Sequence, residues 1–341
     1  MNLSRKHPNA GTRCPGHDYR SRCIYHIVLN KADRFPDFSE VVGIPDDHQW
    51  PPKTSFSDVG KIIFEAISNI KSNFPHTSIL RRCIMPDHVH FAIFIKEKTD
   101  IHLGKIISTL KKECSDRYEA VGNSPNVRFF IPDYHDTFLT GENQLQKMLA
   151  YISDNPRRYL IRKGNPGWFR QFHIERKDTT HKNGISMLNG IRNADMESRY
   201  EAYGNWDLLS EFQRVPVKIS RKYSETELLS WKKLWHTNIL NDGVLVSPFI
   251  NPKEKKVRDW AMDNGGSIIL LTHEPFTERF KPQGKMFDLC AEGRLLIVRI
   301  PPNEQEAEYI RDNDRPCYAH CQRMNDIAKE IAENEFRPIL L

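Results

Sequence analysis

Residues 81–96 read RRCIMPDHVHFAIFIK, and the fold expected for the N-terminal half is built around them. Two apolar runs flank a turn at Met85-Pro86-Asp87, a pattern that predicts a β-hairpin. Side chains two residues apart in a strand point to the same face, so we expect His88 and His90 side by side. The opposite face would be filled by Val89, Phe91, Ile93 and Ile95. Two neighbouring imidazoles can offer two nitrogens to one cation.

The His-x-His tripeptide is weak support for a metal site when taken alone. The chain has 14 His in 341 residues, and random placement gives roughly 0.6 such tripeptides. The choice between a metal site and two unrelated histidines therefore depends on the surrounding sequence.

The composition is typical of a soluble globular protein, with 39% hydrophobic and 28% charged residues. A chain of 341 residues is long enough for two domains with cores of their own. No apolar run is long enough for a membrane span, and the basic N-terminus lacks the apolar segment of a signal peptide. Seven scattered cysteines, an odd number, suit a reducing compartment. We therefore expect a cytoplasmic protein with no membrane partner.

The positive charge is concentrated in the first half of the chain. Residues 1–180 carry 27 Lys+Arg against 20 Asp+Glu, whereas residues 181–341 carry 23 against 24. The basic excess therefore lies in the half that holds the histidine pair. A polyanionic partner for that half is one interpretation, and a solvated basic surface is the other.

Hydrophobic periodicity predicts the order strand, helix, strand, strand, helix, strand in the first half, followed by a third helix. The expected ranges are 22–29, 57–71, 77–85, 88–95, 103–117, 127–131 and 141–159. Residues 30–54 are expected to form a polar, proline-rich loop. This order is that of a split βαβ, ferredoxin-like α+β fold, with one antiparallel sheet and helices on one face.

The second half has a different pattern, in which short apolar runs alternate with helical segments. The runs 243–247, 267–271 and 295–300 predict buried strands, and 252–264, 284–291 and 325–334 predict helices. This alternation indicates a parallel α/β sheet. We expect a first domain over residues 1–178, a linker over 179–206 and a smaller α/β domain over 207–341.

The third helical segment contains Tyr151-Ile152-Ser153-Asp154-Asn155. Tyr151 and Asn155 are four residues apart, so a helix places both on one side. They would offer a phenol and an amide oxygen one turn apart. The alternative is an amphipathic helix whose tyrosine packs on the sheet and which ends at Asn155, before Pro156.

The segment CIMPDHVHFAIF resembles the HUH motif of the single-tyrosine HUH transposases, particularly the REP-associated type. The later stretch FFIPDYHDTFLT, together with LAYISDNPRRYL, resembles the catalytic-helix region of the same proteins. The resemblance covers roughly residues 15–177. It implies that His88 and His90 are paired metal ligands, that Tyr151 is the nucleophile and that Asn155 is the third ligand.

The resemblance implies a metal-dependent endonuclease and strand transferase that acts on single-stranded DNA, often beside a hairpin. A phenol is a weak nucleophile unless it is assisted, and a divalent cation can polarise the phosphate that it attacks. Mixed imidazole and oxygen ligands suit Mg²⁺ or Mn²⁺. The product of the attack would be a phosphotyrosine intermediate. An alternative function is a DNA-hairpin-binding protein that descends from such a transposase and does not cleave.

A basic and aromatic stretch follows Asn155 and contains the candidate DNA-binding residues Arg157, Arg158, Trp168 and Arg170. Cations can bind phosphates, and unpaired bases can stack on aromatic rings. A charged surface beside core aromatics explains the same pattern. His135 and Asp136, before the third helix, could orient a ligand or assist proton transfer.

Other classes fit the sequence less well. A histidine-triad nucleotide hydrolase needs a third alternating histidine, and residue 92 is Ala. A replication initiator with the same motif stays possible, although the chain has no helicase P-loop. Two cysteine and histidine fragments, around Cys14 and Cys317, lack a second pair at zinc-finger spacing. Either a monomer or a homodimer is compatible with the sequence.

Residues 207–300 resemble the Rossmann-like domain of DNA-processing protein A through GVLVSPFINPKEK and RFKPQGKMFDLCAEGRLLIV. The resemblance implies a fold that binds single-stranded DNA in that family. Residues 181–341 carry 23 Lys+Arg against 24 Asp+Glu, and this near-neutral balance does not favour independent DNA binding by the second half. The sequence has no glycine-rich nucleotide-binding signature, so a ligand for this domain is not assigned.

Overall fold

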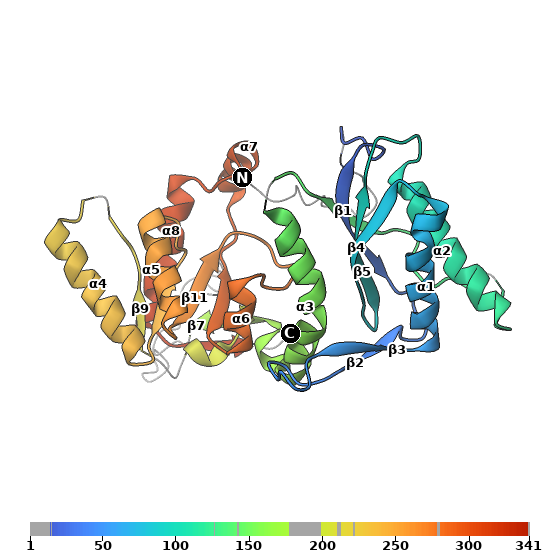
Figure 1. Cartoon of the computed structure of the whole chain (residues 1–341). Helices are drawn as coiled ribbons and strands as arrows, with labels where there is room; N and C mark the ends of the chain where they lie inside the picture. Colours follow the sequence, from blue (N-terminus) through green and yellow to red (C-terminus); the bar gives the residue numbers. More distant parts are fainter. Residues whose placement is uncertain are drawn as a thin grey trace, which may run out of the picture. The chain divides into compact units, whose positions relative to one another are not determined.

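The structure is a computed structural model that describes residues 14, 16–125, 127–141, 143–176, 199–209, 213–220, 222–277 and 280–339. The chain divides into two compact units, residues 1–163 (unit 1) and 164–341 (unit 2). Both units contain helices and strands, so the chain is a mixed α and β protein (Figure 1). Within the described ranges, no helix is both long enough and apolar enough to cross a membrane.

Unit 1 is built on a four-stranded antiparallel sheet in the order β4-β5-β1-β6. Its strands are β1 (Cys23–Asn30), β4 (Thr77–Ile84), β5 (His88–Ile95) and β6 (His135–Phe138). Strands β1 and β4 are parallel to each other, and β5 lies between them. The helix that joins them therefore completes a split βαβ unit, the arrangement that the order of elements predicts.

Helices cover both faces of this sheet, so the expectation of helices on one face only is wrong, because α3 packs on the face opposite α1 and α2. Figure 1 shows α1 (Asp58–Asn73) and α2 (Leu103–Ala120) on one face and α3 (Gln144–Gly164) on the other. Ser57 caps α1, because its side chain accepts a hydrogen bond from the Gly60 amide at 3.2 Å. The face toward α1 and α2 forms the main core, which includes Tyr25, Ile27, Ile63, Ile67, Phe91, Ile93, Ile106 and Leu110.

Two further features of unit 1 differ from the sequence prediction. A hairpin of β2 (Ser39–Val42) and β3 (Lys53–Phe56) stands where a loop over 30–54 was expected. These strands are short and largely polar, so they lack a clear alternating pattern. The strand predicted over 127–131 is also wrong, because Phe130 forms only an isolated bridge with Lys31. The fourth strand is β6, whose sequence HDTF has little apolar character.

Unit 2 contains a seven-stranded sheet in the order β13-β7-β8-β12-β11-β10-β9. Strands β9 to β12 pair in parallel, which confirms the parallel pairing of the three predicted apolar runs, whereas β8, β7 and β13 add antiparallel pairs. The bounds are β7 (Gln171–Arg176), β8 (Arg199–Gly204), β9 (Arg214–Pro216), β10 (Val244–Ser247), β11 (Ser267–Thr272), β12 (Leu295–Arg299) and β13 (Phe336–Ile339). The sheet is therefore mixed and not purely parallel.

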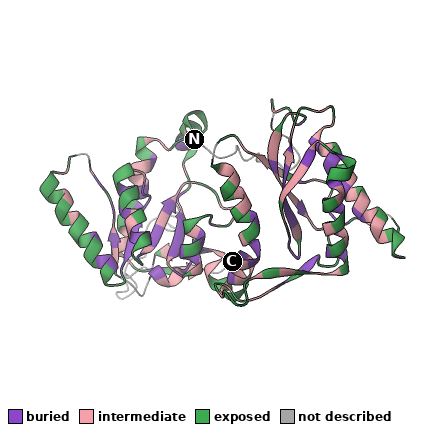
Figure 2. Cartoon of the chain, viewed as in Figure 1, coloured by how far each residue is buried: buried purple, intermediate pink, exposed green. Residues whose placement is uncertain are grey.

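Helices also cover both faces of the unit 2 sheet. One face packs against α4 (Glu225–Leu240), α5 (Pro252–Asp263) and α6 (Lys285–Ala291), and the other against α8 (Tyr318–Glu333). Figure 2 shows the strands as the most buried part of this unit. Among the described strands, β9 to β12 follow chain order without a reversal. The ligand crevice that doubly wound sheets form at such a reversal is therefore not present between these four strands.

The predicted domain limits differ from the observed ones. The first unit ends at Lys163 and not at 178, because β7 pairs with β8 in the second sheet. Residues 179–198 of the predicted linker lie outside the described residues, and 199–204 form β8. Unit 2 is consequently the longer unit. The remaining elements are α7 (Glu304–Asn313), η1 (Pro166–Trp168) and η2 (Trp206–Leu209).

A buried carboxylate joins α7 to α8 in unit 2. Glu306 is 5% exposed and accepts hydrogen bonds from the Asn303 amide, from Arg323 and from His320. Burial alone would raise the pKa of Glu306, but these hydrogen bonds outweigh burial and lower the pKa to about 2. Glu306 therefore stays ionised inside the protein at neutral pH.

Replacing Glu306 by Gln should lower the free energy of unfolding by about 3 kcal/mol at pH 7. The native pKa is lowered, so this contribution is complete above the unfolded pKa of about 4.5 and is lost as the pH falls toward 2. Urea unfolding of both proteins between pH 7 and pH 3 measures the difference. Glu304→Gln, on the exposed first turn of the same helix, is the matched control and should show little pH dependence. A Glu306→Gln effect that does not shrink with falling pH would contradict the assignment.

Candidate metal and tyrosine site

Strand β5 separates an apolar face from a histidine face. Val89, Phe91, Ile93 and Ile95 are buried in the core, as the alternation predicts. His88 and His90 point to the opposite face; His90 is 5% exposed, and the His88 side chain is 16% exposed. The central position of β5 in the sheet explains the burial of these two histidines, because β5 pairs with β4 on one side and with β1 on the other.

The two histidines are held in a chain of short polar contacts. Their Nε2 atoms lie 2.9 Å apart. The Nδ1 atom of His88 lies 2.6 Å from the carboxylate of Asp87, and the Nδ1 atom of His90 lies 2.9 Å from Nε2 of His26. Each ring is therefore oriented through its Nδ1 atom, and both Nε2 atoms face the same point.

His26 is a functional candidate to which the sequence reading gave no role. It lies on β1 opposite Ala92 of β5, diagonal to His90 on the same face. Burial, reinforced by the nearby His88, lowers the pKa of His26 to about 4. A neutral His26 can accept a hydrogen bond from Nδ1–H of His90, and Asp87 can accept one from Nδ1–H of His88. Both arrangements leave the Nε2 lone pairs available, as in metal sites whose histidines have outer partners.

The Nε2 pair has the spacing expected of two ligands on one cation. Two donors about 2.1 Å from a cation and at right angles to each other lie about 3.0 Å apart. The observed separation is 2.9 Å. Within the described part of the chain, no group of three His, Cys, Asp or Glu side chains is arranged for a metal ion. A site here would need a third donor of another kind, such as an amide.

Helix α3 brings the tyrosine to the histidines. Ile152 is fully buried and packs against Val41, Cys83, Met85 and Ala92, which anchors the helix on the histidine face. The neighbouring Tyr151 is 38% exposed. Its ring centroid lies 5.7 Å from that of His90 and 6.0 Å from that of His26, both edge to face. Tyr151 and the histidine pair therefore form one cluster.

Asn155 is 6% exposed, and its amide substitutes for a missing backbone donor. Helix α3 continues through Pro156, which has no N–H to give to the carbonyl of Ile152. The Nδ2 atom of Asn155 lies 3.4 Å from that carbonyl and 2.8 Å from the carbonyl of Tyr151. These bonds use Nδ2 and not Oδ1. The alternative in which the helix ends at Asn155 is wrong, because α3 runs through Pro156 to Gly164. The role of Asn155 as a ligand stays a prediction.

The four candidate DNA-binding residues fall in both units. In unit 1, Arg157 pairs with Asp46 at 2.7 Å, and the buried Arg158 places its guanidinium 5.4 Å from the Tyr151 ring centroid. In unit 2, Arg170 lies over the ring of Trp206 at 4.4 Å, and Trp168 packs against the core. A role of these residues in DNA binding stays a prediction.

His135, which was considered for proton transfer, lies on β6 opposite Val28 of β1. This register puts it on the same face of the sheet as His26, His88 and His90. It is exposed, whereas His26 and His90 lie inward. The histidine face therefore extends to the edge strand.

Comparison with known proteins gives a family match for unit 1. Residues 19–155 match the sequence model of the family described as Transposase IS200 like. The match spans the four-stranded sheet, α1, α2 and α3 as far as Asn155. No curated protein matches the chain.

Two solved structures are similar to part of the chain. One is a REP-associated tyrosine transposase bound to a REP hairpin, with 15% identity, a TM-score of 0.32, and coverage of 43% of this chain and 74% of that one. The other is a putative transposase from Deinococcus radiodurans R1, with 14% identity, a TM-score of 0.26, and coverage of 42% and 96%.

Truncating Ile152 to Ala should loosen the attachment of α3 to the sheet. Loss of a buried isoleucine costs about 2–5 kcal/mol, and the loss here falls between one helix and the sheet. Amide hydrogen exchange should therefore accelerate in α3 more than in α1. Leu149→Ala, at a partly buried position on α3, should have a smaller effect. Unchanged exchange in α3 of the Ile152→Ala protein would show that this contact does not hold the helix.

Proposed function

We propose that unit 1, whose residues 19–155 match the IS200-like transposase family, is a metal-dependent single-stranded DNA endonuclease and strand transferase. Its nucleophile is Tyr151, and its product on the cleaved strand is a phosphotyrosine bond. The observation that carries the proposal is the cluster of the Tyr151 phenol ring with His90 and His26. A partly exposed tyrosine beside paired imidazoles has the parts that phosphoryl transfer needs.

The proposed cation ligands are Nε2 of His88, Nε2 of His90 and Oδ1 of Asn155, with Mg²⁺ or Mn²⁺ as the metal. Such a cation would polarise a phosphate oxygen and neutralise the charge that develops on it. Asp87 and His26 would act through the histidines, because each can accept a hydrogen bond from an Nδ1–H group and so fix the ring.

The proposed reaction transfers phosphorus from a sugar oxygen to the phenol oxygen of Tyr151. As the bond between the Tyr151 oxygen and phosphorus forms, the phenol loses its proton, and the bond from phosphorus to one sugar oxygen breaks. The departing sugar oxygen takes up a proton. Because one phosphodiester replaces another, a second strand end can reverse the step and rejoin the DNA without nucleotide hydrolysis. The Arg158 guanidinium, which lies 5.4 Å from the Tyr151 ring centroid and 3.4 Å from the carboxylate of Asp154, would add positive charge near a phosphate attacked by Tyr151.

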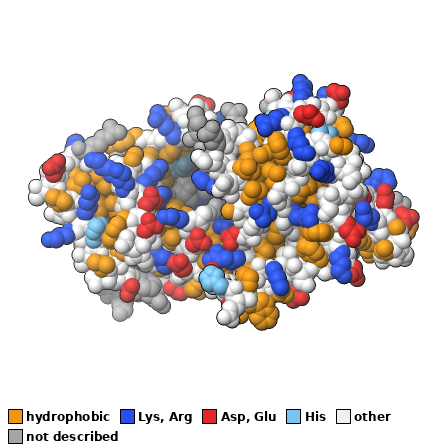
Figure 3. All heavy atoms as spheres, viewed as in Figure 1, with side chains coloured by type: hydrophobic (Ala, Val, Ile, Leu, Met, Phe, Trp, Pro, Cys, Tyr) orange, Lys and Arg blue, Asp and Glu red, His pale blue; other side chains and the backbone are white. Residues whose placement is uncertain are grey.

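The proposed substrate is single-stranded DNA beside a hairpin. The support is the basic excess of the first half of the chain and the family match of unit 1. Figure 3 shows Lys and Arg side chains spread over the visible face of unit 1 and not gathered in one patch.

The covalent bond gives the most direct test of the function. Labelled single strands copied from the DNA that flanks the coding sequence, hairpins included, are incubated with the protein and Mn²⁺. We expect a protein–DNA adduct that survives denaturation and disappears in Tyr151→Phe, because only the phenol oxygen can form it. Tyr118→Phe, a phenol on α2 at the opposite face, is the control and should keep the adduct. DNA binding without an adduct in the parent protein would favour a non-cleaving hairpin-binding protein.

The metal is tested by binding Mn²⁺ alone. Asp87→Asn should weaken Mn²⁺ binding about 10- to 100-fold, because the carboxylate that orients His88 is lost. Asp58→Asn, on α1 at the opposite face, removes the same charge and should leave the affinity unchanged. Electron paramagnetic resonance of free Mn²⁺ measures both. Equal Mn²⁺ affinities of the two variants would show that Asp87 does not support the metal site.

His88→Ala should abolish the adduct yet keep most of the DNA affinity, because phosphate contacts account for most of that affinity.

A further inference from the structure

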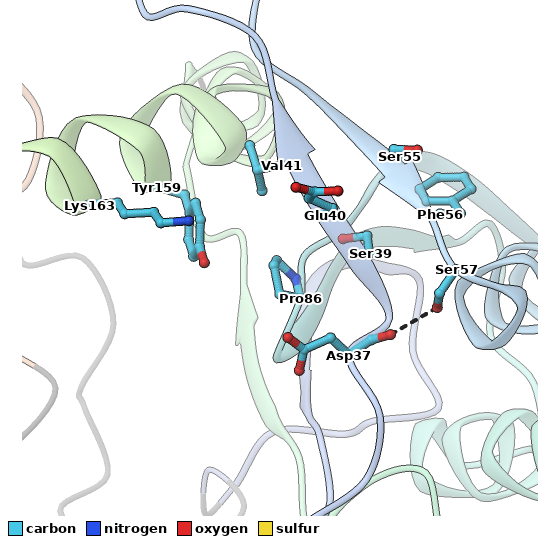
Figure 4. Close-up of a pocket in the computed structure, with 10 residues that line it drawn as sticks. All are labelled: Asp37, Ser39, Glu40, Val41, Ser55, Phe56, Ser57, Pro86, Tyr159 and Lys163. Atoms are coloured by element: carbon cyan, nitrogen blue, oxygen red, sulfur yellow. Dashed lines mark hydrogen bonds between the residues drawn. The ribbon is translucent and has the colours of Figure 1, made fainter.

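Unit 1 has an open, polar pocket next to the histidine site. The pocket has a volume of about 500 Å³ and lies between α3 and the β2–β3 hairpin. Figure 4 shows Tyr159 and Lys163 projecting from α3 on one side and Glu40 on β2. Its other lining residues are Asp37, Ser39, Val41, Ser55, Phe56, Ser57 and Pro86.

The polar groups of this pocket fall into two sets. Some have structural partners, since the Ser39 hydroxyl donates to the carbonyl of Ile84 at 2.7 Å and Asp37 pairs with Lys31 at 2.5 Å. Glu40, Tyr159 and Lys163 form no such bond or ion pair to other residues that the structure describes. These three groups are therefore available to a ligand.

The pocket shares the β4–β5 turn and helix α3 with the histidine and tyrosine site. Pro86 of its wall is two residues before His88 in the β4–β5 turn. On α3, Tyr159 comes four residues after Asn155, and Lys163 comes eight residues after it. These spacings place Tyr159 about 6 Å and Lys163 about 12 Å further along the helix axis than Asn155. A strand with a phosphate at Tyr151 therefore has its neighbouring nucleotides within reach of the pocket.

The charges of the pocket select which part of a nucleotide enters it. The Glu40 carboxylate, which has no cationic partner among the residues that the structure describes, repels a phosphate, so the phosphate belongs near Lys163 at the edge. An aromatic ring such as Tyr159 can stack on an unpaired base. A carboxylate accepts hydrogen bonds from an exocyclic amino group, such as N4 of cytosine, and meets repulsion from a carbonyl oxygen at the same position.

We propose that this pocket binds an unpaired nucleobase next to the scissile phosphate and that Glu40 selects an amino-bearing base edge over a carbonyl-bearing one. The proposal rests on the proposed function and gives it a base preference. Tyr159 supplies the stacking surface, and Lys163 holds the phosphate of the same nucleotide.

The test compares the binding of two oligonucleotides that differ only in the ring group concerned. Twelve-residue strands of deoxycytidine and of deoxyuridine have bases of equal size and carry an amino group or a carbonyl at position 4. Binding is measured on Tyr151→Phe protein without added metal, so that no strand is cut. We expect the cytosine strand to bind at least about fivefold more tightly, the lower limit for one such contact.

Glu40→Gln in the same background should bring the ratio of the two affinities close to one, because the amide can pair with either base. Glu119→Gln on α2 removes the same charge from an exposed position and should leave the ratio unchanged. Tyr159→Leu should weaken both strands by about fivefold or more, since it removes the stacking surface.

Equal binding of the two strands by the protein with Glu40 intact would overturn the pocket proposal. So would a ratio that Glu40→Gln and Glu119→Gln leave at the same value. Both outcomes are separate from the proposed function, which depends on the adduct to Tyr151. An adduct without a base preference contradicts only the proposal for the pocket. A base preference without an adduct contradicts only the proposal that Tyr151 cleaves DNA.

Discussion

The register of β5 is the constraint on which unit 1 depends. Val89 and Phe91 are buried against α1 and α2, and this burial decides which side chains remain for the opposite face. A slip of one residue would exchange the two faces and place His88 and His90 in the apolar core. The free energy that favours the core packing is therefore the same free energy that presents the histidines. Because β5 is paired on both sides, its register is also fixed by two neighbouring strands.

Much of unit 1 could be predicted because its signals are local. The alternation in β5, the Ser57 cap and the four-residue spacing of Tyr151 and Asn155 each follow from a few adjacent residues. His26 had no such signal, since its contact with His90 joins residues 64 positions apart. The β2–β3 hairpin was missed because its strands are short and polar, and so was the pocket that it lines. The passage of α3 through Pro156 depends on one side-chain amide, which periodicity does not reveal.

Unit 2 shows the opposite balance. Its apolar strands were predicted because parallel strands buried on both faces read as continuous apolar runs. The antiparallel strands β7, β8 and β13 were not predicted. Residues 179–198 separate β7 from its partner β8 in the sequence, and its other partner β13 lies near the end of the chain. Long sequence separation hid the pairing of β7 with β13, and for this reason the predicted domain limit of 178 does not coincide with the division between the two compact units after Lys163.

The polar contacts that hold His88, His90 and Asn155 lower the entropy that these side chains can lose when a ligand binds. The side-chain rotations of His88, His90 and Asn155 are each restricted by a partner, namely Asp87, His26 and the α3 carbonyls. Ordering a free side chain during binding costs about 0.5–1.5 kcal/mol. For these three residues the ordering takes place when the chain folds. A ligand that binds them meets side chains with little rotational freedom left to lose.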